Sequence, residues 1–107
     1  PLLLHFWATW CGICKLEQNS IDDISKTHKV ITIAMNSGAA AEVSRFMTNN
    51  SLSFPVIVDE HGSIAKRFGV SAVPTSFVLD PNGKVAFAEM GYSTEWGLRL
   101  RLWLAGQ

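Results

Sequence analysis

Apolar residues in this chain form short runs separated by polar turns, a pattern typical of buried strands. Leu2–Ala8 is almost wholly apolar and ends at polar Thr9, so it predicts a strand that is covered on both faces. Val30–Met35 is rich in β-branched residues and predicts a second strand. Further strands are predicted over Phe54–Asp59, Thr75–Asp80 and Lys84–Met90, with a hairpin turn at Asn82-Gly83.

Segments with helical periodicity lie between these strands. Cys11–Thr27 predicts a helix, and shorter helices are predicted over Ala39–Asn50 and over Ser63–Gly69, where Gly69 closes the last turn. The succession of strand, helix and strand indicates a parallel βαβ unit and therefore an α/β fold. In the first helix the predicted apolar stripe is Ile13, Leu16, Ile21 and Ile24, and the residues expected outside it are Lys15, Asp22, Asp23 and Lys26.

The C-terminal stretch Ser93–Gly106 fits two templates. Alternation of leucines with Arg99, Arg101 and Trp103 matches a strand. A helix is also consistent, because Ser93 or Thr94 could cap its start and Gly106 could close its end. We predict the helix, and the residues that would share one of its faces are Trp96, Leu100, Trp103 and Leu104.

Composition limits the classes of function. The chain has 107 residues, of which 48% are hydrophobic and 17% charged, as expected for one domain spanning residues 1–107. Nine basic residues balance nine acidic ones, so no charge excess indicates a nucleic-acid partner or an anionic membrane. The chain enters its first strand without an initiator Met, so we expect N-terminal residues of the full protein to be missing, among which a signal peptide or anchor could lie.

The two cysteines, Cys11 and Cys14, allow three interpretations. As a structural staple they would close a very small loop, which constrains an unfolded chain less than a long one does. As a structural zinc site they would need about four Cys or His ligands, whereas His5, His28 and His61 are scattered. The third interpretation is a redox centre.

Placement favours the redox centre. Cys11 lies where a predicted strand ends and a helix begins, and unpaired N–H groups and the helix dipole stabilise a thiolate there. Cys14 is one helical turn further along and is expected to be more buried. We therefore expect Cys11 to attack a disulfide and Cys14 to resolve the mixed disulfide.

Two motifs resemble the thioredoxin-like proteins: "FWATWCGIC", around the cysteines, and "AKRFGVSAVPTSFVLDPNGKV" further along. The stretch from about Gly38 to Asp59 resembles an insertion of the TlpA-like branch, and Glu17 completes a "WCxxCxxE" pattern of that branch. The branch includes extracytoplasmic reductases of cytochrome c maturation and suppressor-of-copper-sensitivity proteins. The resemblance implies a thioredoxin-like fold with a mixed, mostly parallel central sheet, an antiparallel hairpin edge and flanking helices.

The resemblance also implies a site and a biological setting. In the segment Val73-Pro74-Thr75, Pro74 would be a cis-proline facing the cysteines, and the Val73 backbone would pair with a bound substrate strand. No cofactor is implied. The implied partners are protein thiols and disulfides and a membrane or soluble thiol-transfer protein that re-reduces the pair. The implied setting is a monomer in the bacterial periplasm, with a membrane anchor preceding Pro1 as one option.

Several positions depart from, or add to, the family pattern. Gly12-Ile13 stands where thioredoxins usually carry Gly-Pro, and Ile13 restores a backbone N–H. No cation or His lies between the cysteines, which favours a reductant over a strong oxidant. Trp10 is expected to shield the thiol and to offer an apolar docking surface.

Two polar side chains near the cysteines have open roles. His5 lies six residues before Cys11 and would either accept the proton of Cys14 or be a structural core histidine. Glu17 lies on the same side of the helix as Cys14 and would either shuttle protons or be a solvated helix residue.

Two other functions remain as alternatives to disulfide exchange. Soft thiolates select Cu(I), so a copper- or zinc-binding module using the same cysteines is one of them. Thiol peroxidases of this fold carry Thr three residues before the attacking Cys, where this chain has Ala8, with Thr9 one residue off.

Overall fold

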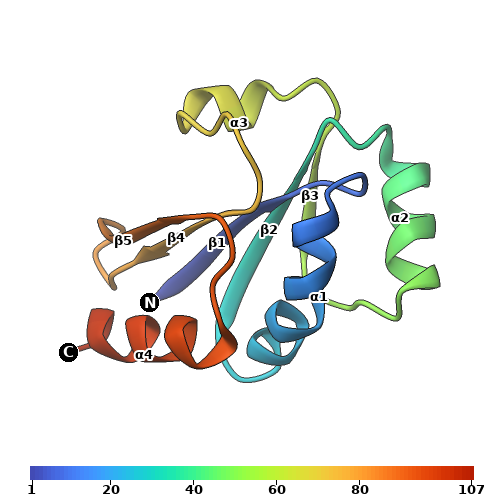
Figure 1. Cartoon of the computed structure of the whole chain (residues 1–107). Coiled ribbons are helices and arrows are strands. Elements are labelled where there is room, and N and C mark those ends of the chain that lie inside the picture. Colours follow the sequence, from blue (N-terminus) through green and yellow to red (C-terminus); the bar gives the residue numbers. More distant parts are fainter.

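The computed structural model describes all 107 residues, and its elements follow the order β1, α1, β2, α2, β3, α3, β4, β5, α4 (Figure 1). Each predicted element is present, with small differences at its ends. The strands are β1 (Leu2–Trp7), β2 (Lys29–Met35), β3 (Val56–Asp59), β4 (Thr75–Leu79) and β5 (Val85–Met90). The helices are α1 (Gly12–Ser25), α2 (Ala40–Asn49), α3 (Ser63–Arg67) and α4 (Glu95–Ala105).

The strands form one five-stranded sheet in the order β3-β2-β1-β4-β5. β1 is parallel to β2 and β2 to β3, whereas β4 is antiparallel to both of its neighbours, β1 and β5. The predicted mixed sheet and its hairpin edge are thus confirmed, and the single reversed strand β4 makes both antiparallel pairings. The hairpin turn is closed by the Gly83 N–H, which donates to Asp80 O at 2.9 Å.

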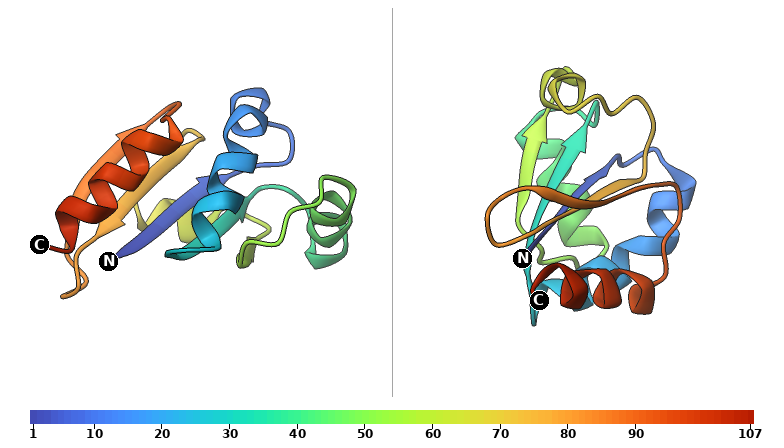
Figure 2. Two further views of the ribbon diagram at one scale, coloured as in Figure 1. Left: turned by 90° about the horizontal axis from the view of Figure 1, so that it is seen from below. Right: turned by 90° about the vertical axis from the view of Figure 1, so that its left-hand side faces the viewer.

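The central strand β1 is covered on both faces, which explains why it is apolar without alternation (Figure 2). Leu3 and Trp7 belong to the larger core, together with residues of α1, α2 and α4. Leu4 and Phe6 face the opposite way and pack with Ala65 of α3. The central strand therefore carries side chains into two separate cores.

The predicted apolar stripe of α1 is wrong in its first half. Ile13 and Leu16 are 49% and 72% exposed. The buried line instead passes through Cys14, Glu17, Ile21 and Ile24, whose spacing of three, four and three residues also follows one helical face. The first turn of α1 therefore faces the sheet with a thiol and a carboxyl rather than with Ile13, and periodicity alone could not distinguish these two phases.

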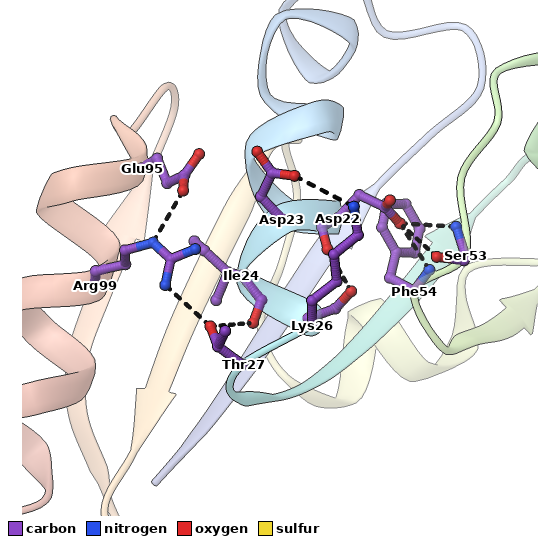
Figure 3. Close-up of polar contacts among 10 residues, drawn as sticks. Asp22, Asp23, Ile24, Lys26, Thr27, Ser53, Phe54, Glu95 and Arg99 are labelled. Atoms are coloured by element: carbon purple, nitrogen blue, oxygen red, sulfur yellow. Dashed lines mark hydrogen bonds and ion pairs between the residues drawn. The ribbon is translucent and has the colours of Figure 1, made fainter.

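Asp22, predicted to lie outside the stripe, is also buried. Its Oδ1 accepts the backbone N–H groups of Ser53 at 2.7 Å and Phe54 at 2.9 Å (Figure 3). Buried polar groups are stable when such partners satisfy them. Asp22 therefore ties α1 to the segment that leads from α2 into β3.

The C-terminal helix is confirmed as α4, with Thr94 as its cap: the Thr94 hydroxyl accepts the N–H of Gly97 at 3.0 Å. The four residues predicted to share one face do so, and that face is exposed. Leu98, Leu102 and Ala105 are buried against the rest of the molecule, and the exposed residues are Trp96, Leu100, Trp103 and Leu104. No helix of the structure is both long enough and apolar enough to cross a bilayer.

Two turns meet where β2 and β3 end. Asn36, directly after β2, has a positive φ of 51° and donates its N–H to Asp59 O at 2.9 Å. The Asp59 carboxylate in turn accepts the N–H of Ala65 at 2.9 Å and so caps α3. Gly62 has a positive φ of 75°, and a Cβ there would lie 2.9 Å from Asn36 Oδ1, so glycine is favoured at this position.

Candidate active site

Cys11 and Cys14 lie at the junction between β1 and α1. Cys11 is the N-cap of α1, in an extended conformation, and its Sγ accepts the N–H of Cys14 at 3.1 Å. The two sulfurs form a disulfide, and the Cα atoms are 5.2 Å apart. Once the disulfide is reduced, the same N–H and the helix dipole would stabilise a Cys11 thiolate.

The two sulfurs differ in exposure in the expected direction. Cys11 is 8% exposed and Cys14 is 3% exposed. Cys14 also belongs to the stripe of α1 that faces the sheet. Both cysteines are buried in the disulfide form, and Cys11 is the less covered of the two.

The loop before β4 brings the second motif to the cysteines. The Val73–Pro74 peptide bond is cis, as the resemblance implied, and Cys11 Sγ lies 3.7 Å from Val73 O. Thr75 donates its hydroxyl to Ala72 O at 2.7 Å, and Gly91 donates its N–H to Pro74 O at 2.8 Å. The loop is therefore held on both sides while its backbone faces Cys11.

An apolar rim is formed at the surface by residues close to the cysteines in the chain. Trp10, Ile13 and Leu16 are all exposed, although each is large and apolar. Gly12 adds no side chain between the cysteines, and a Cβ there would have no neighbour within 4 Å. The Trp10 ring is oriented by its Nε1–H, which donates to Asn36 O at 2.9 Å.

A serine supports the turn that orients Trp10. Buried Ser37 accepts the N–H of Thr9 at 2.9 Å and donates its hydroxyl to Met35 O at 3.0 Å. The residues just before the cysteines are therefore bonded to the end of β2. No sequence pattern indicates this link, because it depends on the pairing of β1 and β2.

A buried carboxyl and a buried imidazole lie on the inner side of the site. Glu17 is fully buried, and its Oε2 accepts the N–H of Ser93 at 2.9 Å. Its Oε1 has no hydrogen-bond partner, and the nearest cationic or imidazole nitrogen is His5 Nε2 at 4.0 Å. The other ring nitrogen, His5 Nδ1, lies 2.8 Å from Ser76 Oγ.

Burial shifts both groups away from their charged forms. It raises the pKa of Glu17 to about 7, with the Ser93 N–H bond acting in the opposite direction. It lowers the pKa of His5 to about 4. At neutral pH the imidazole is therefore uncharged, and Glu17 is able to take up or release a proton.

Ser76 and Ser93, which hold these two groups, were not found from the sequence. Ser76 lies directly opposite His5 in the β1–β4 pairing, and Ser93 contributes only its backbone. A lone serine in a strand and a backbone N–H in a loop carry no pattern that could indicate such contacts. No group of three or more His, Cys, Asp or Glu side chains is gathered as a metal site.

Comparisons with known proteins agree with this geometry. The Redoxin family model matches residues 1–98. A thioredoxin-like protein of Haemophilus influenzae is 35% identical over 106 residues, which cover 98% of this chain and 63% of that protein. The thiol-disulfide oxidoreductase ResA of Geobacillus thermodenitrificans is 31% identical over 94% of this chain and 60% of its own length.

A solved structure is similar over nearly the whole chain. The exposed lipoprotein thioredoxin Etrx1 of Streptococcus pneumoniae superposes with a TM-score of 0.81 at 25% identity, over 96% of this chain and 83% of that one. The chain spans less than two thirds of the two curated relatives, 63% and 60%.

Proposed function

This chain belongs to the Redoxin family as a thioredoxin-like, TlpA-like protein, and on that premise we propose that it exchanges disulfides with protein substrates through Cys11 and Cys14. The observation that carries the proposal is Cys11 at the start of α1, with its Sγ 3.7 Å from the carbonyl before a cis-proline. Cys11 Sγ therefore lies both where the helix start stabilises a thiolate and next to a backbone segment that can hydrogen-bond a substrate strand.

The direction we propose is reduction of the substrate. The Cys11 thiolate attacks a substrate disulfide, forming a mixed disulfide and releasing one substrate thiolate. Cys14, after losing its proton, attacks Cys11 Sγ, which forms the Cys11–Cys14 disulfide and releases the second substrate thiolate. Two electrons pass from the protein dithiol to the substrate disulfide, and a further thiol protein restores the dithiol.

Glu17 is the proposed acceptor of the Cys14 proton. It lies three residues after Cys14 on the same buried face of α1. Its pKa, raised by burial to about 7, suits proton transfer near neutral pH. His5 is the weaker candidate, because burial lowers its pKa to about 4 and so disfavours the imidazolium.

Protein segments are the proposed substrates. The exposed rim of Trp10, Ile13 and Leu16 offers apolar surface beside the sulfur, and the Val73 backbone offers hydrogen bonds to an extended strand. Pro74 and Thr75 shape the loop that presents this backbone.

The setting is also a proposal. We infer an extracytoplasmic, periplasmic protein, monomeric and folded as one domain over residues 1–107, with an N-terminal anchor as one option. The name of the similar pneumococcal protein, an exposed lipoprotein thioredoxin, supports the location. The thiol protein that re-reduces Cys11 and Cys14 would then be membrane-bound or soluble in the same compartment.

Reduction of insulin by dithiothreitol, with and without the protein, tests the activity. We expect acceleration by the native chain and none by Cys11→Ser. Cys14→Ser should instead accumulate a mixed disulfide with the substrate, because Cys11 still attacks and nothing resolves it. No acceleration, together with tight one-to-one Cu(I) or Zn(II) binding or with peroxide consumption, would replace this proposal with one of the alternatives.

A further inference from the structure

Glu17 Oε1 is a carboxyl oxygen buried without a partner, and the mechanism above assigns nothing to the two groups beyond it. Glu17 Oε1 lies 4.0 Å from His5 Nε2, and the other ring nitrogen, His5 Nδ1, lies 2.8 Å from Ser76 Oγ. His5 and Ser76 are 2% and 3% exposed, so bulk solvent has little access to these contacts. The protonation of the imidazole therefore depends on its two neighbours.

The hydroxyl of Ser76 determines which ring nitrogen carries the proton. A buried hydroxyl has one hydrogen to donate, and leaving it unpaired is costly. The one hydrogen-bond partner of Ser76 Oγ in the structure is His5 Nδ1. With Ser76 as the donor and Nδ1 as the acceptor, the hydrogen of the neutral imidazole lies on Nε2, the nitrogen that is 4.0 Å from Glu17 Oε1.

We infer that Ser76 fixes His5 as the Nε2–H tautomer, so that a neutral imidazole donates to Glu17 Oε1 and stabilises the ionised carboxylate. His5 and Ser76 are positioning residues in this scheme. A shortening of about 1 Å from the present 4.0 Å brings the two atoms into hydrogen-bond range when Glu17 ionises. The functional meaning of the inference rests on Glu17 being the proton acceptor proposed above.

No other charged group competes for this role. Glu17 is faced by Cys14 from its own helix, by His5 from β1 and by the Ser93 N–H from the loop before α4. No Lys or Arg nitrogen lies within 4.0 Å of its carboxyl, and the arginines of α4 are paired with other carboxylates. Those pairs are Arg99 with Glu95 and Arg101 with Glu89.

The proton balance of the resolving step follows from this arrangement. The proton leaves Cys14 Sγ and binds the Glu17 carboxylate, while His5 stays neutral throughout and gains no proton. The Cys14 thiolate then attacks Cys11 Sγ, and the substrate sulfur leaves with the bonding pair. His5 contributes by keeping Glu17 ionised until that proton arrives.

The tautomer can be measured directly by ¹⁵N NMR of the histidine ring in the disulfide form, with the signals of His5 identified by their loss in His5→Asn. We expect a protonated Nε2 and an unprotonated, hydrogen-bonded Nδ1 at pH 7. A protonated Nδ1 in the native protein would overturn the inference. This readout needs no substrate, so it is independent of whether the chain catalyses disulfide exchange.

The second measurement is the pKa of Glu17, followed by ¹³C NMR of its carboxyl carbon. Ser76→Ala should raise this pKa by about one unit, because the imidazole is then free to turn a lone pair toward the carboxylate. Ser76→Thr keeps the hydroxyl and should restore the native value, and Ser44→Ala, at an exposed position, should not change it. An unchanged pKa of Glu17 in folded Ser76→Ala would refute the inference.

Activity separates this inference from the proposed function. In the insulin assay, Ser76→Ala should move the rate–pH profile to higher pH by about one pH unit, the same shift as in the pKa of Glu17. Ser76→Thr should leave the profile in place. If the native chain fails to reduce insulin but the tautomer and pKa results hold, the proposed function fails and the positioning of Glu17 stands. If the native chain is active and the profile of Ser76→Ala does not move, the positioning role fails alone.

Discussion

Ser93 donates its backbone N–H to Glu17 Oε2 at 2.9 Å, across a sequence separation of 76 residues. The same loop, just before α4, holds the cis-proline segment through the Gly91 N–H bond to Pro74 O. The buried carboxyl of α1 and the loop that faces Cys11 are therefore connected through three consecutive residues, 91–93.

Glu17→Gln should change how stability depends on pH. The pKa of Glu17 is raised from 4.5 to about 7 by folding, so ionisation of the native protein costs free energy. That cost is absent below about pH 4.5, grows as the pH rises and is complete above about pH 7. Relative to E17Q, the native chain should lose about 3 kcal/mol of unfolding free energy across this window.

Urea unfolding of the disulfide form at several pH values measures this difference. Comparing the native chain with E17Q cancels the contributions of the other carboxylates to the pH dependence of stability. It also cancels the opposite contribution of His5, whose pKa is lowered by burial. A difference between the two variants that does not change with pH would mean that Glu17 is not perturbed in the folded protein.

Leu98→Ala and Leu100→Ala test the orientation of α4. Leu98 is completely buried and Leu100 is exposed, although the two lie two residues apart. Leu98→Ala should lower the free energy of unfolding by about 3 kcal/mol, and Leu100→Ala by less than about 1 kcal/mol. Denaturant titration compares them, and equal losses would contradict the observed face.

Trp10→Ala should weaken the binding of protein substrates without preventing disulfide exchange. The exposed indole beside Cys11 provides docking surface, so its removal should raise KM for insulin about 10-fold and leave reaction with a small disulfide nearly unchanged. Trp103→Ala is the matched control, because Trp103 is 60% exposed against 62% for Trp10 but lies on α4. An equal effect of both variants would show that Trp10 has no special role.

Asp22→Ala should destabilise the segment between α2 and β3. The substitution leaves the part-buried N–H of Ser53 and the buried N–H of Phe54 without their acceptor, and we expect a loss of about 2 kcal/mol. Asp23→Ala, next along the chain, removes only an exposed ion pair with Lys26 and should cost less than about 1 kcal/mol. Amide hydrogen exchange at Ser53 and Phe54 should rise in the first variant and not in the second.

The fold and the cysteine pair were predictable because their signals are local. Leu2–Ala8 and Val30–Met35 are runs whose burial is visible in their composition, and Cys11 marks a strand-to-helix junction. The cis bond at Pro74 came from the resemblance, since a Val–Pro dipeptide alone favours the trans form.

The faces of α1 and α4 were not predictable, because both helices have large apolar residues on more than one side. Trp96 and Trp103 form the more apolar-looking face of α4, yet Leu98 and Leu102 are the residues that pack inside. Ionisable side chains were misjudged for a related reason. The burial of Asp22 depends on acceptor–donor pairs with residues about 30 positions away, which no local pattern reveals.

The fit between Gly62 and Asn36 has a further consequence for variation in this protein. A side chain at Gly62 would displace the Asn36 side-chain amide, and the backbone carbonyl of the same residue accepts the Nε1–H of Trp10. A substitution at Gly62, half the chain away from the cysteines, is therefore expected to change how Trp10 is oriented in the apolar rim. Directed evolution for new substrate preferences should therefore recover substitutions at the Gly62 turn, although this turn lies outside the apolar rim.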